Sequence, residues 1–256
     1  SGQPFHDIIR LCPSAVQTLT KCYRNQEAVY QSALKIRNGE IPEGDVQSER
    51  ERWIVQSIRD PRAAHNEILR AVREGEVDFE SDIILCCRNG ENDGSTECSV
   101  VAFNRDIKDI VNPNEDGSYK IAPGDRVINT KNHSELDVWN GTTGSCDKID
   151  SDGAMWVHLD YKNAAGEDRV LIPKKEAREW QLAYALTVHK SQGSQYRKVF
   201  FVVSKRDQMN LLDRPMVYTA VTRTKAECRV VGDVGAFHGA IRTVKHKMTV
   251  MQELSK

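Results

Sequence analysis

Four short, mainly apolar segments constrain the fold of this chain more than any other feature. They are DIILCC (82–87), LAYALTV (182–188), VFFVV (199–203) and CRVVGD (228–233). A strand with one solvated face alternates apolar and polar residues, whereas a continuous apolar strand is covered on both faces. Helix-like segments that begin at His189 and at Pro215 separate the last three runs, and this order implies a parallel sheet. The sequence therefore predicts an α/β domain.

Three further segments have the pattern of helices. Apolar residues recur at helical spacing within 14–40, and an Asn-Gly pair followed by Pro supplies the stop. The other two helices are predicted over 60–75, which has Pro at its start and Gly at its end, and over 99–110. The charged stretch 43–60 lacks a periodic signal and is predicted to be a loop or an exposed helix.

Over 121–178 the sequence pattern changes to one of short strands separated by turns. AMWVHLDY (154–161) alternates with period two, and DRVLIP (168–173) follows after a short turn. These features predict a small antiparallel barrel inserted into the α/β domain. The predicted organisation is a first piece of that domain at 1–120, the barrel at 121–178 and a second piece at 179–256.

Composition excludes little. With 36 basic and 37 acidic residues the net charge is −1, which neither indicates nor excludes nucleic-acid binding. The seven cysteines form no CxxC pair and no zinc-ligand spacing, so we expect no metal site and a reducing compartment. No apolar run approaches the ~18 residues of a membrane span, and the first residues do not resemble a signal peptide. A cytoplasmic protein without a membrane partner is expected.

Two polar segments carry the candidate chemistry. TVHKSQGSQ (187–195) follows an apolar strand directly, and its amides and hydroxyls suit a phosphate, with Gly193 allowing close approach. The alternative is a capped helix start with an incidental histidine. In VYTAVTRTK (217–225), Arg223 lies on the helical side opposite Val217 and Val221, where its planar group can reach a phosphate of a neighbouring domain. The alternative here is a solvated surface arginine.

Together these segments resemble motifs V and VI of superfamily 1 helicases in the RecD-like form. The resemblance rests on AYALTVHKSQGSQY, followed about thirty residues later by VYTAVTRTK. TLTKCYRNQ, centred on Arg24, resembles motif IV of the same family. VAFNRDIKDIVNP, GDRVINTKN and DVWNGTTG match the family's order between motifs IV and V. The similarity runs from about residue 5 to residue 235.

The resemblance implies a RecA-like second motor domain interrupted by an SH3-like barrel. Arg24 and Arg223 would be the two arginines that face the γ-phosphate of ATP across the cleft between RecA-like domains. Such arginines stabilise charge in the transition state and are worth ~10³-fold or more in rate. The resemblance thus gives these two residues a catalytic role.

The same resemblance divides the 187–195 segment between two ligands. The residues expected near ATP are Gly193, Gln195 and Gln192. The residues expected on the backbone of single-stranded DNA are Thr187 and His189, with Lys190 and Ser191 as further candidates.

Two departures from the family pattern affect function. Gln195 stands where the family usually has Glu, so a carboxylate that accepts hydrogen bonds is replaced by an amide that can also donate. The chain contains neither a GxxxxGK[ST] motif nor an Asp-Glu pair for a Walker B site. We therefore expect ATP and Mg²⁺ to be used by a longer protein with a P-loop domain, and this chain alone to bind neither.

The expected function is the C-terminal motor portion of an ATP-dependent DNA helicase, moving 5′ to 3′ on single-stranded DNA by family analogy. Expected partners are single-stranded DNA, the N-terminal P-loop domain, and nuclease or repair-complex subunits. One alternative is a non-enzymatic helicase-derived module that binds DNA or protein. Another is a superfamily 1 RNA helicase.

Overall fold

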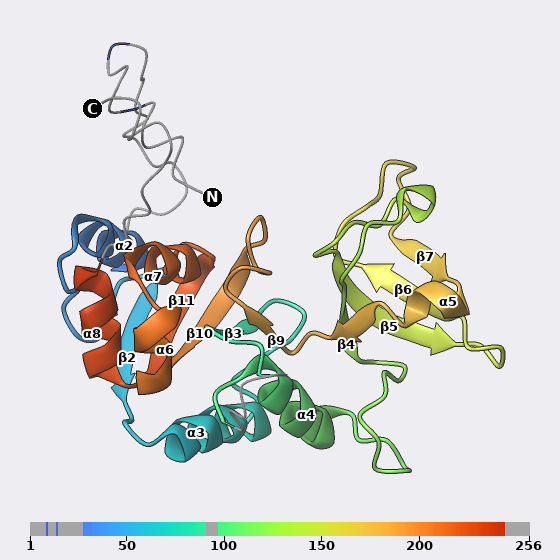
Figure 1. Cartoon of the computed structure of the whole chain (residues 1–256), viewed down its shortest axis with the longest axis horizontal. Coiled ribbons are helices and arrows are strands. Elements are labelled where there is room, and N and C mark those ends of the chain that lie inside the picture. The colour runs from blue at the N-terminus through green and yellow to red at the C-terminus, as the bar shows by residue number, and fades with distance from the viewer. Residues whose placement is uncertain (1–8, 10–13, 15–27, 91–96, 244–256) are drawn as a thin grey trace.

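The computed structural model describes residues 28–90 and 97–243, together with the single positions 9 and 14. A six-stranded sheet and a five-stranded sheet lie side by side in Figure 1, with α3 (Pro61–Arg73) and α4 (Val100–Val111) below them. The predicted α/β class with a parallel-containing sheet is confirmed. Within the described residues, no helix is long and apolar enough to cross a membrane.

The six-stranded sheet is parallel except at one edge, where the first strand pairs antiparallel with the second. Its strands in spatial order are β1 (Val46–Gln47), β2 (Arg52–Ser57), β11 (Thr224–Gly232), β10 (Tyr196–Val203), β3 (Ile83–Cys86) and β9 (Ala185–Thr187). All the parallel strands begin on one side of the sheet and end on the opposite side. The side that holds the strand starts is here called the amino edge, and the side that holds the strand ends is called the carboxyl edge; neither term refers to an outermost strand.

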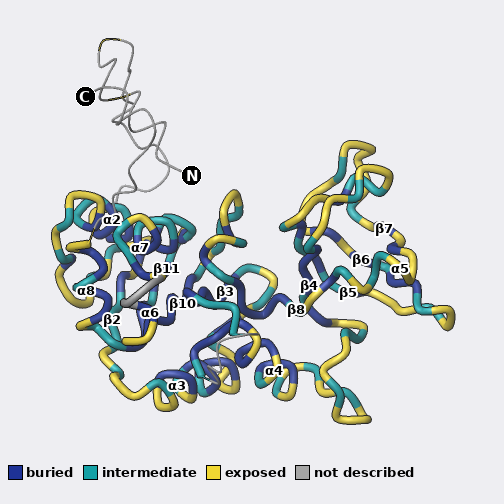
Figure 2. The backbone as a smooth tube through the Cα atoms, viewed as in Figure 1, coloured by how far each residue is buried: buried dark blue, intermediate teal, exposed yellow. Residues whose placement is uncertain are grey.

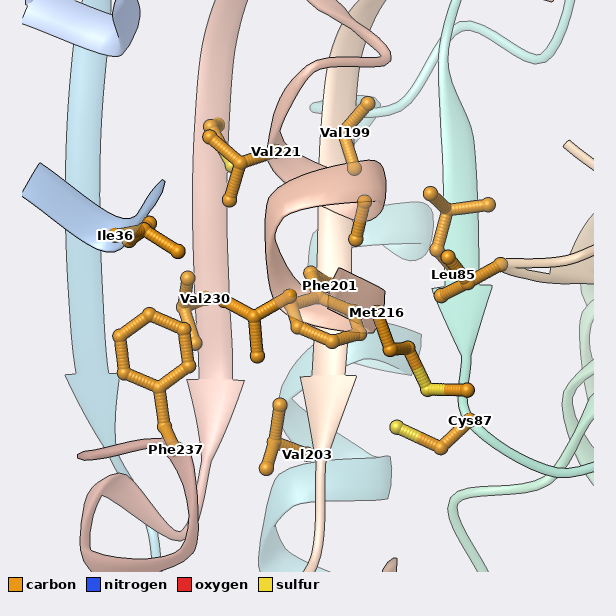
Figure 3. Close-up of a cluster of buried hydrophobic side chains, with 14 of the residues drawn as sticks. Ile36, Leu85, Cys87, Val199, Phe201, Val203, Met216, Val221, Val230 and Phe237 are labelled. Atoms are coloured by element: carbon orange, nitrogen blue, oxygen red, sulfur yellow. The ribbon is translucent and has the colours of Figure 1, made fainter. Parts of the chain in front are cut away.

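Helices cover both faces of this sheet, as the apolar runs predict. Val199, Phe201 and Val203 of β10 pack with α2 (Ala28–Asn38), α7 (Arg214–Val221) and α8 (Val234–Arg242) on one face. Figure 3 shows these three side chains together with those of the helices. The alternate residues of β10, Phe200 and Val202, pack with α3 and α4 on the other face. The middle strands are accordingly buried along most of their length (Figure 2).

The helices predicted over 60–75 and 99–110 are confirmed as α3 and α4. Each begins where a side-chain oxygen accepts a hydrogen bond from a backbone amide of the first turn, at Asp60 and at Ser99. α2 lies within the segment predicted over 14–40, whose earlier part falls outside the described residues. Neither α6 (Lys205–Asn210) nor α8 was predicted from the sequence.

The prediction of a loop or exposed helix over 43–60 is wrong, because this stretch contains β1 and β2. In β2 only Trp53 is fully buried, so the strand lacks an apolar pattern. Its conformation is set by pairing with β11, and Arg52 also contacts Glu227, a residue 175 positions away. Such long-range pairing is invisible to local periodicity.

The five-stranded sheet is antiparallel and lies between the two pieces of the parallel sheet in sequence. Its strands in spatial order are β7 (Arg169–Ile172), β6 (Met155–Leu159), β5 (Thr143–Ile149), β4 (Arg126–Asn129) and β8 (Trp180–Leu182). A 3₁₀ turn, η2 (Ser134–Leu136), and a short helix, α5 (Lys174–Ala177), connect them. The strands enclose a separate apolar core. Because β8 belongs to this sheet, the sheet extends to residue 182, beyond the predicted range.

The apolar run at 182–188 was predicted to be one strand, and this is wrong. It is divided between β8 and β9, which belong to different sheets, with Ala183 and Tyr184 between them. The segment that passes from β8 in one sheet to β9 in the other is here called the crossing, and the buried amide of Asn104 on α4 holds it in place. Its Nδ2 donates to the carbonyls of Leu182 and Ala185 at 3.0 and 3.1 Å, and its Oδ1 accepts from Ala185 N at 2.8 Å. The crossing is therefore fixed by side-chain hydrogen bonds.

A buried ion pair joins the two sheets next to this crossing. Lys108 Nζ on α4 lies 2.7 Å from Asp125 Oδ2 at the entry to β4, and both side chains are 0% exposed. The same carboxylate accepts from Asn112 Nδ2 at 2.8 Å and from the Tyr184 hydroxyl at 2.6 Å. Burial raises the pKa of Tyr184 well above its ordinary value, with the Asp125 carboxylate adding to the effect, so the hydroxyl stays a donor.

Lys108→Met tests the importance of this junction. The substitution leaves the Asp125 carboxylate buried without its cation, and we expect the free energy of unfolding to fall by about 3–5 kcal/mol. Lys148→Met is the matched control, because Lys148 is mostly exposed in its pair with Asp150 and should change stability little. Urea denaturation measures both, and equal losses in the two variants would contradict a structural role for the buried pair.

Candidate functional site

The loop 188–195 connects the carboxyl edge of β9 to the amino edge of β10. Thr187 pairs with Cys86, whose partner on β10 is Val202, whereas β10 begins at Tyr196. Val202 lies six residue steps beyond Tyr196 along β10, so the loop returns about 20 Å along the sheet. The two ends of the segment singled out in the sequence therefore lie at opposite edges of the parallel sheet.

The helix predicted to begin at His189 is wrong. A single turn forms, in which Ser191 N donates to Thr187 O at 3.1 Å and Lys190 N donates to Thr187 Oγ1 at 3.2 Å. Gly193 then adopts a φ of +93°, a conformation that favours glycine and ends the turn. The chain then continues to the start of β10.

The four candidates for DNA contact cluster at the start of the loop, at the carboxyl edge of the parallel sheet. Thr187 is half-buried and His189 is exposed, while Lys190 Nζ donates to Gln181 Oε1 at 3.1 Å. Ser191 is fully buried, and its hydroxyl donates to Val188 O at 2.8 Å. A contact between Ser191 and DNA would require the hydroxyl to leave that bond. The exposed imidazole and the lysine are the better placed groups.

Arg223 lies at the other end of the loop, on the amino edge. The predicted helix over 215–225 ends earlier than expected, at Val221, so Arg223 belongs to the connection between α7 and β11. Its Nε donates to Thr219 O at 3.2 Å, and one terminal nitrogen donates to Ser194 O at 3.2 Å. Tyr196 N in turn donates to Arg223 O at 2.9 Å. The structure thus holds the guanidinium against the loop.

The three candidates for nucleotide contact differ in their surroundings. Gln192 and Gly193 are exposed, whereas Gln195 is half-buried and its Nε2 is a buried atom without a hydrogen-bond partner among the described residues. Burial also raises the pKa of the neighbouring Tyr196 hydroxyl. An unpaired buried amide indicates a place where a ligand can supply the missing acceptor. Arg24, the other predicted catalytic arginine, lies outside the described residues.

A cavity of about 500 Å³ opens beside Gln195, between the loop and the antiparallel sheet. Sequence reasoning missed the wall that the antiparallel sheet supplies, which includes Arg126, Asp160 and Tyr161. No local pattern relates those residues to the loop, because only the crossing between β8 and β9 brings the two sheets together. The geometry therefore comprises an exposed basic group at the carboxyl edge and a positioned arginine with a cavity at the amino edge.

Comparison with known proteins shows that the chain is similar to helicases. A family model described as the UvrD-like helicase C-terminal domain matches residues 182–231, a range that contains the loop, α7 and Arg223. The ATP-dependent RecD2 DNA helicase of Deinococcus radiodurans is 27% identical over 99% of this chain and 33% of its own length. The RecBCD enzyme subunit RecD of Mycobacterium tuberculosis is 28% identical over 82% of this chain and 37% of its own length.

These relatives confirm the predicted resemblance to RecD-like helicases over most of the chain. The chain spans about a third of the length of either relative. Among solved structures, the Pif1 helicase from Candida albicans is similar with a TM-score of 0.49 and 14% identity, over 92% of this chain and 58% of that one.

Gly193→Ala tests the conformation of the loop. A Cβ at this position would meet no other atom, so the cost arises from the positive φ alone, and we expect a loss of about 1–2 kcal/mol in the free energy of unfolding. Gly44→Ala is the control, because a Cβ there also meets nothing and its φ is not positive. Denaturant titration compares them, and a Gly193 variant as stable as the control would contradict the left-handed turn.

Proposed function

We propose that this chain is the C-terminal motor portion of an ATP-dependent DNA helicase of the RecD-like type. In this proposal the parallel sheet is a RecA-like second motor domain, in two sequence pieces, and the antiparallel sheet is an SH3-like insertion. The observation that carries the proposal is the position of Arg223. Its guanidinium is anchored by the Ser194 carbonyl at the edge where Gln195 also lies.

Arg223 suits the role of a residue that stabilises charge on ATP. A catalytic arginine must be held before the reaction, because a flexible side chain would first have to be ordered. Backbone carbonyls of Thr219 and Ser194 supply that restraint. ATP is the substrate in this proposal, and Mg²⁺ would neutralise phosphate charge while held by the P-loop domain of the longer protein. By the family resemblance, Arg24 is proposed as the second arginine that faces the γ-phosphate.

The start of the loop, at the carboxyl edge of the sheet, is proposed to contact single-stranded DNA. The exposed ring of His189 and the ammonium of Lys190 suit contacts with the phosphate backbone, and Thr187 lies at the end of the strand beside them. A 5′ to 3′ polarity is proposed by analogy with the RecD-like relatives alone. Because one relative is a RecBCD subunit, nuclease or repair-complex subunits are proposed partners. The proposed location is the cytoplasm.

A binding module without enzymatic activity is the competing proposal. The cavity lined by both sheets favours it in part, since that site needs no second motor domain. An RNA helicase is the other alternative, and unwinding of matched DNA and RNA duplexes by the longer protein separates it from the DNA helicase. The anchored Arg223 favours the motor, because a module that only binds has no need of a positioned arginine at this edge.

Arg223→Ala in the longer protein tests the catalytic assignment. We expect DNA-stimulated ATP hydrolysis to fall about 10³-fold while the affinity for ATP changes little, because the arginine acts on charge that develops in the transition state. Arg242→Ala on α8 is the control, since Arg242 is exposed at the C-terminal end of that helix. Turnover near the normal rate in the Arg223 variant would remove the assignment.

The chain alone should hydrolyse ATP no faster than buffer, with or without single-stranded DNA. The reason is that its sequence contains no P-loop to hold the phosphates. Phosphate release by the purified chain and by the longer protein measures the difference. Hydrolysis by the isolated chain that disappears in its Arg223→Ala variant would contradict the division of the site between two domains.

A further inference from the structure

The cavity beside Gln195 is built by both sheets. Gly193, Ser194 and Gln195 of the loop line it, and so do Thr143 of β5 and Asp160 and Tyr161, which directly follow β6. Its volume of about 500 Å³ is within the range of small-ligand sites. The Asn104 and Asp125 contacts hold the sheets together, so this space is a fixed feature of the fold.

The two arginines that line the cavity are each paired with a carboxylate. Arg126 and Asp160 form a two-point ion pair, with one nitrogen–oxygen distance of 2.8 Å. Arg197 lies 2.7 Å from the buried carboxylate of Asp82. Because both arginines are already paired with carboxylates, they offer a phosphate little net positive charge, whereas a neutral polar group needs none. The wall therefore favours an uncharged ligand with hydrogen-bonding edges.

Tyr161 supplies an aromatic surface at this cavity. Its side chain is about half exposed, at 45%, although it lines the cavity. The hydroxyl lies 2.7 Å from Thr142 Oγ1, an atom that also accepts from Trp139 N at 3.0 Å. This hydrogen bond holds the ring in position. An exposed and fixed aromatic ring is the kind of surface on which a nucleobase stacks.

Gln195 supplies a hydrogen-bonding group at the same cavity. Its Nε2 is buried and has no partner among the described residues. Leaving a buried donor unpaired is costly, and a ligand acceptor would remove that cost. A primary amide can donate and accept along one edge, as the edges of nucleobases do. The exposed ammonium of Lys225 at the same cavity can contact an adjacent phosphate.

We propose that this cavity binds an unpaired nucleobase, with Tyr161 stacking on its face and Gln195 contacting its edge. The proposal rests on the proposed function, since it adds a base-binding site to the nucleotide and DNA contacts of the motor. The base belongs either to single-stranded DNA or to a free nucleotide. Both sources present the same flat ring, and the experiment separates them.

The test measures binding of the 256-residue chain by fluorescence anisotropy. The probes are a labelled oligothymidylate of about 12 nucleotides and an abasic oligonucleotide of the same length, with AMP as a competitor. We expect the oligothymidylate to bind at least about fivefold more tightly than the abasic strand, as one stacked base provides. Displacement by AMP assigns the site to a free nucleotide, and its absence assigns the site to DNA. If AMP alone binds, Tyr161→Ala should weaken that binding by a similar factor.

Three variants locate the effect. Tyr161→Ala should abolish the preference for bases, and Tyr161→Phe should keep most of it, because the ring is retained. Trp139→Ala is the matched control, since Trp139 is an exposed aromatic residue near Tyr161 that does not line the cavity. Thermal melting confirms that each variant is folded, and Tyr161→Leu, which removes the aromatic face but keeps an apolar side chain, replaces the Ala variant if that variant is unfolded.

Equal affinity for the base-containing and abasic strands, combined with AMP affinity that Tyr161→Ala does not change, overturns the proposal. So does the absence of binding to every probe. Loss of base preference in the Trp139 variant instead of the Tyr161 variants also overturns it. These outcomes leave the motor proposal untouched, because that proposal is judged by ATP hydrolysis in the Arg223→Ala variant of the longer protein.

Discussion

The buried ion pair between Lys108 and Asp125 is the interaction on which the arrangement of the two sheets depends. Two charges without access to water are tolerated only when each is fully paired, and Asp125 accepts from Asn112 and Tyr184 as well. Both the ion pair and the Asn104 amide start from α4, which packs on the parallel sheet. A single helix thereby sets where the antiparallel sheet lies, and the cavity beside Gln195 exists because of that placement.

Local sequence patterns predicted the elements that are defined by their own burial. The run VFFVV at β10 is covered on both faces, and the Pro and Gly around α3 mark its ends, so these elements could be found without a structure. β2 could not be found in this way, because its conformation depends on pairing with β11 and only Trp53 of the strand is fully buried. The division of 182–188 between two sheets was also hidden, since both halves are equally apolar.

The parts of the candidate site that lie within one sequence segment were predictable, whereas the contacts between distant segments were not. The segments around His189 and Arg223 could be singled out, because each combines polar groups with a strand or helix end. That Ser194 anchors Arg223 could not be foreseen, since the contact uses a backbone carbonyl. The wall containing Tyr161 was equally invisible, because it reaches the loop only through the β8–β9 crossing. Sequence thus indicated the chemical groups, and the fold determined which of them meet.

The path of the loop 188–195 suggests how contacts at its two ends can influence each other. A rigid helix after β9 would have kept all of the polar groups at the carboxyl edge. The single turn and the positive φ of Gly193 instead direct the chain to the amino edge, where the Ser194 carbonyl receives the Arg223 guanidinium. The turn at Thr187 and the carbonyl that positions Arg223 therefore belong to one short continuous segment. In a motor, such a short connection would link the start of the loop, which is proposed to contact DNA, to its last residues, which are proposed to face the nucleotide.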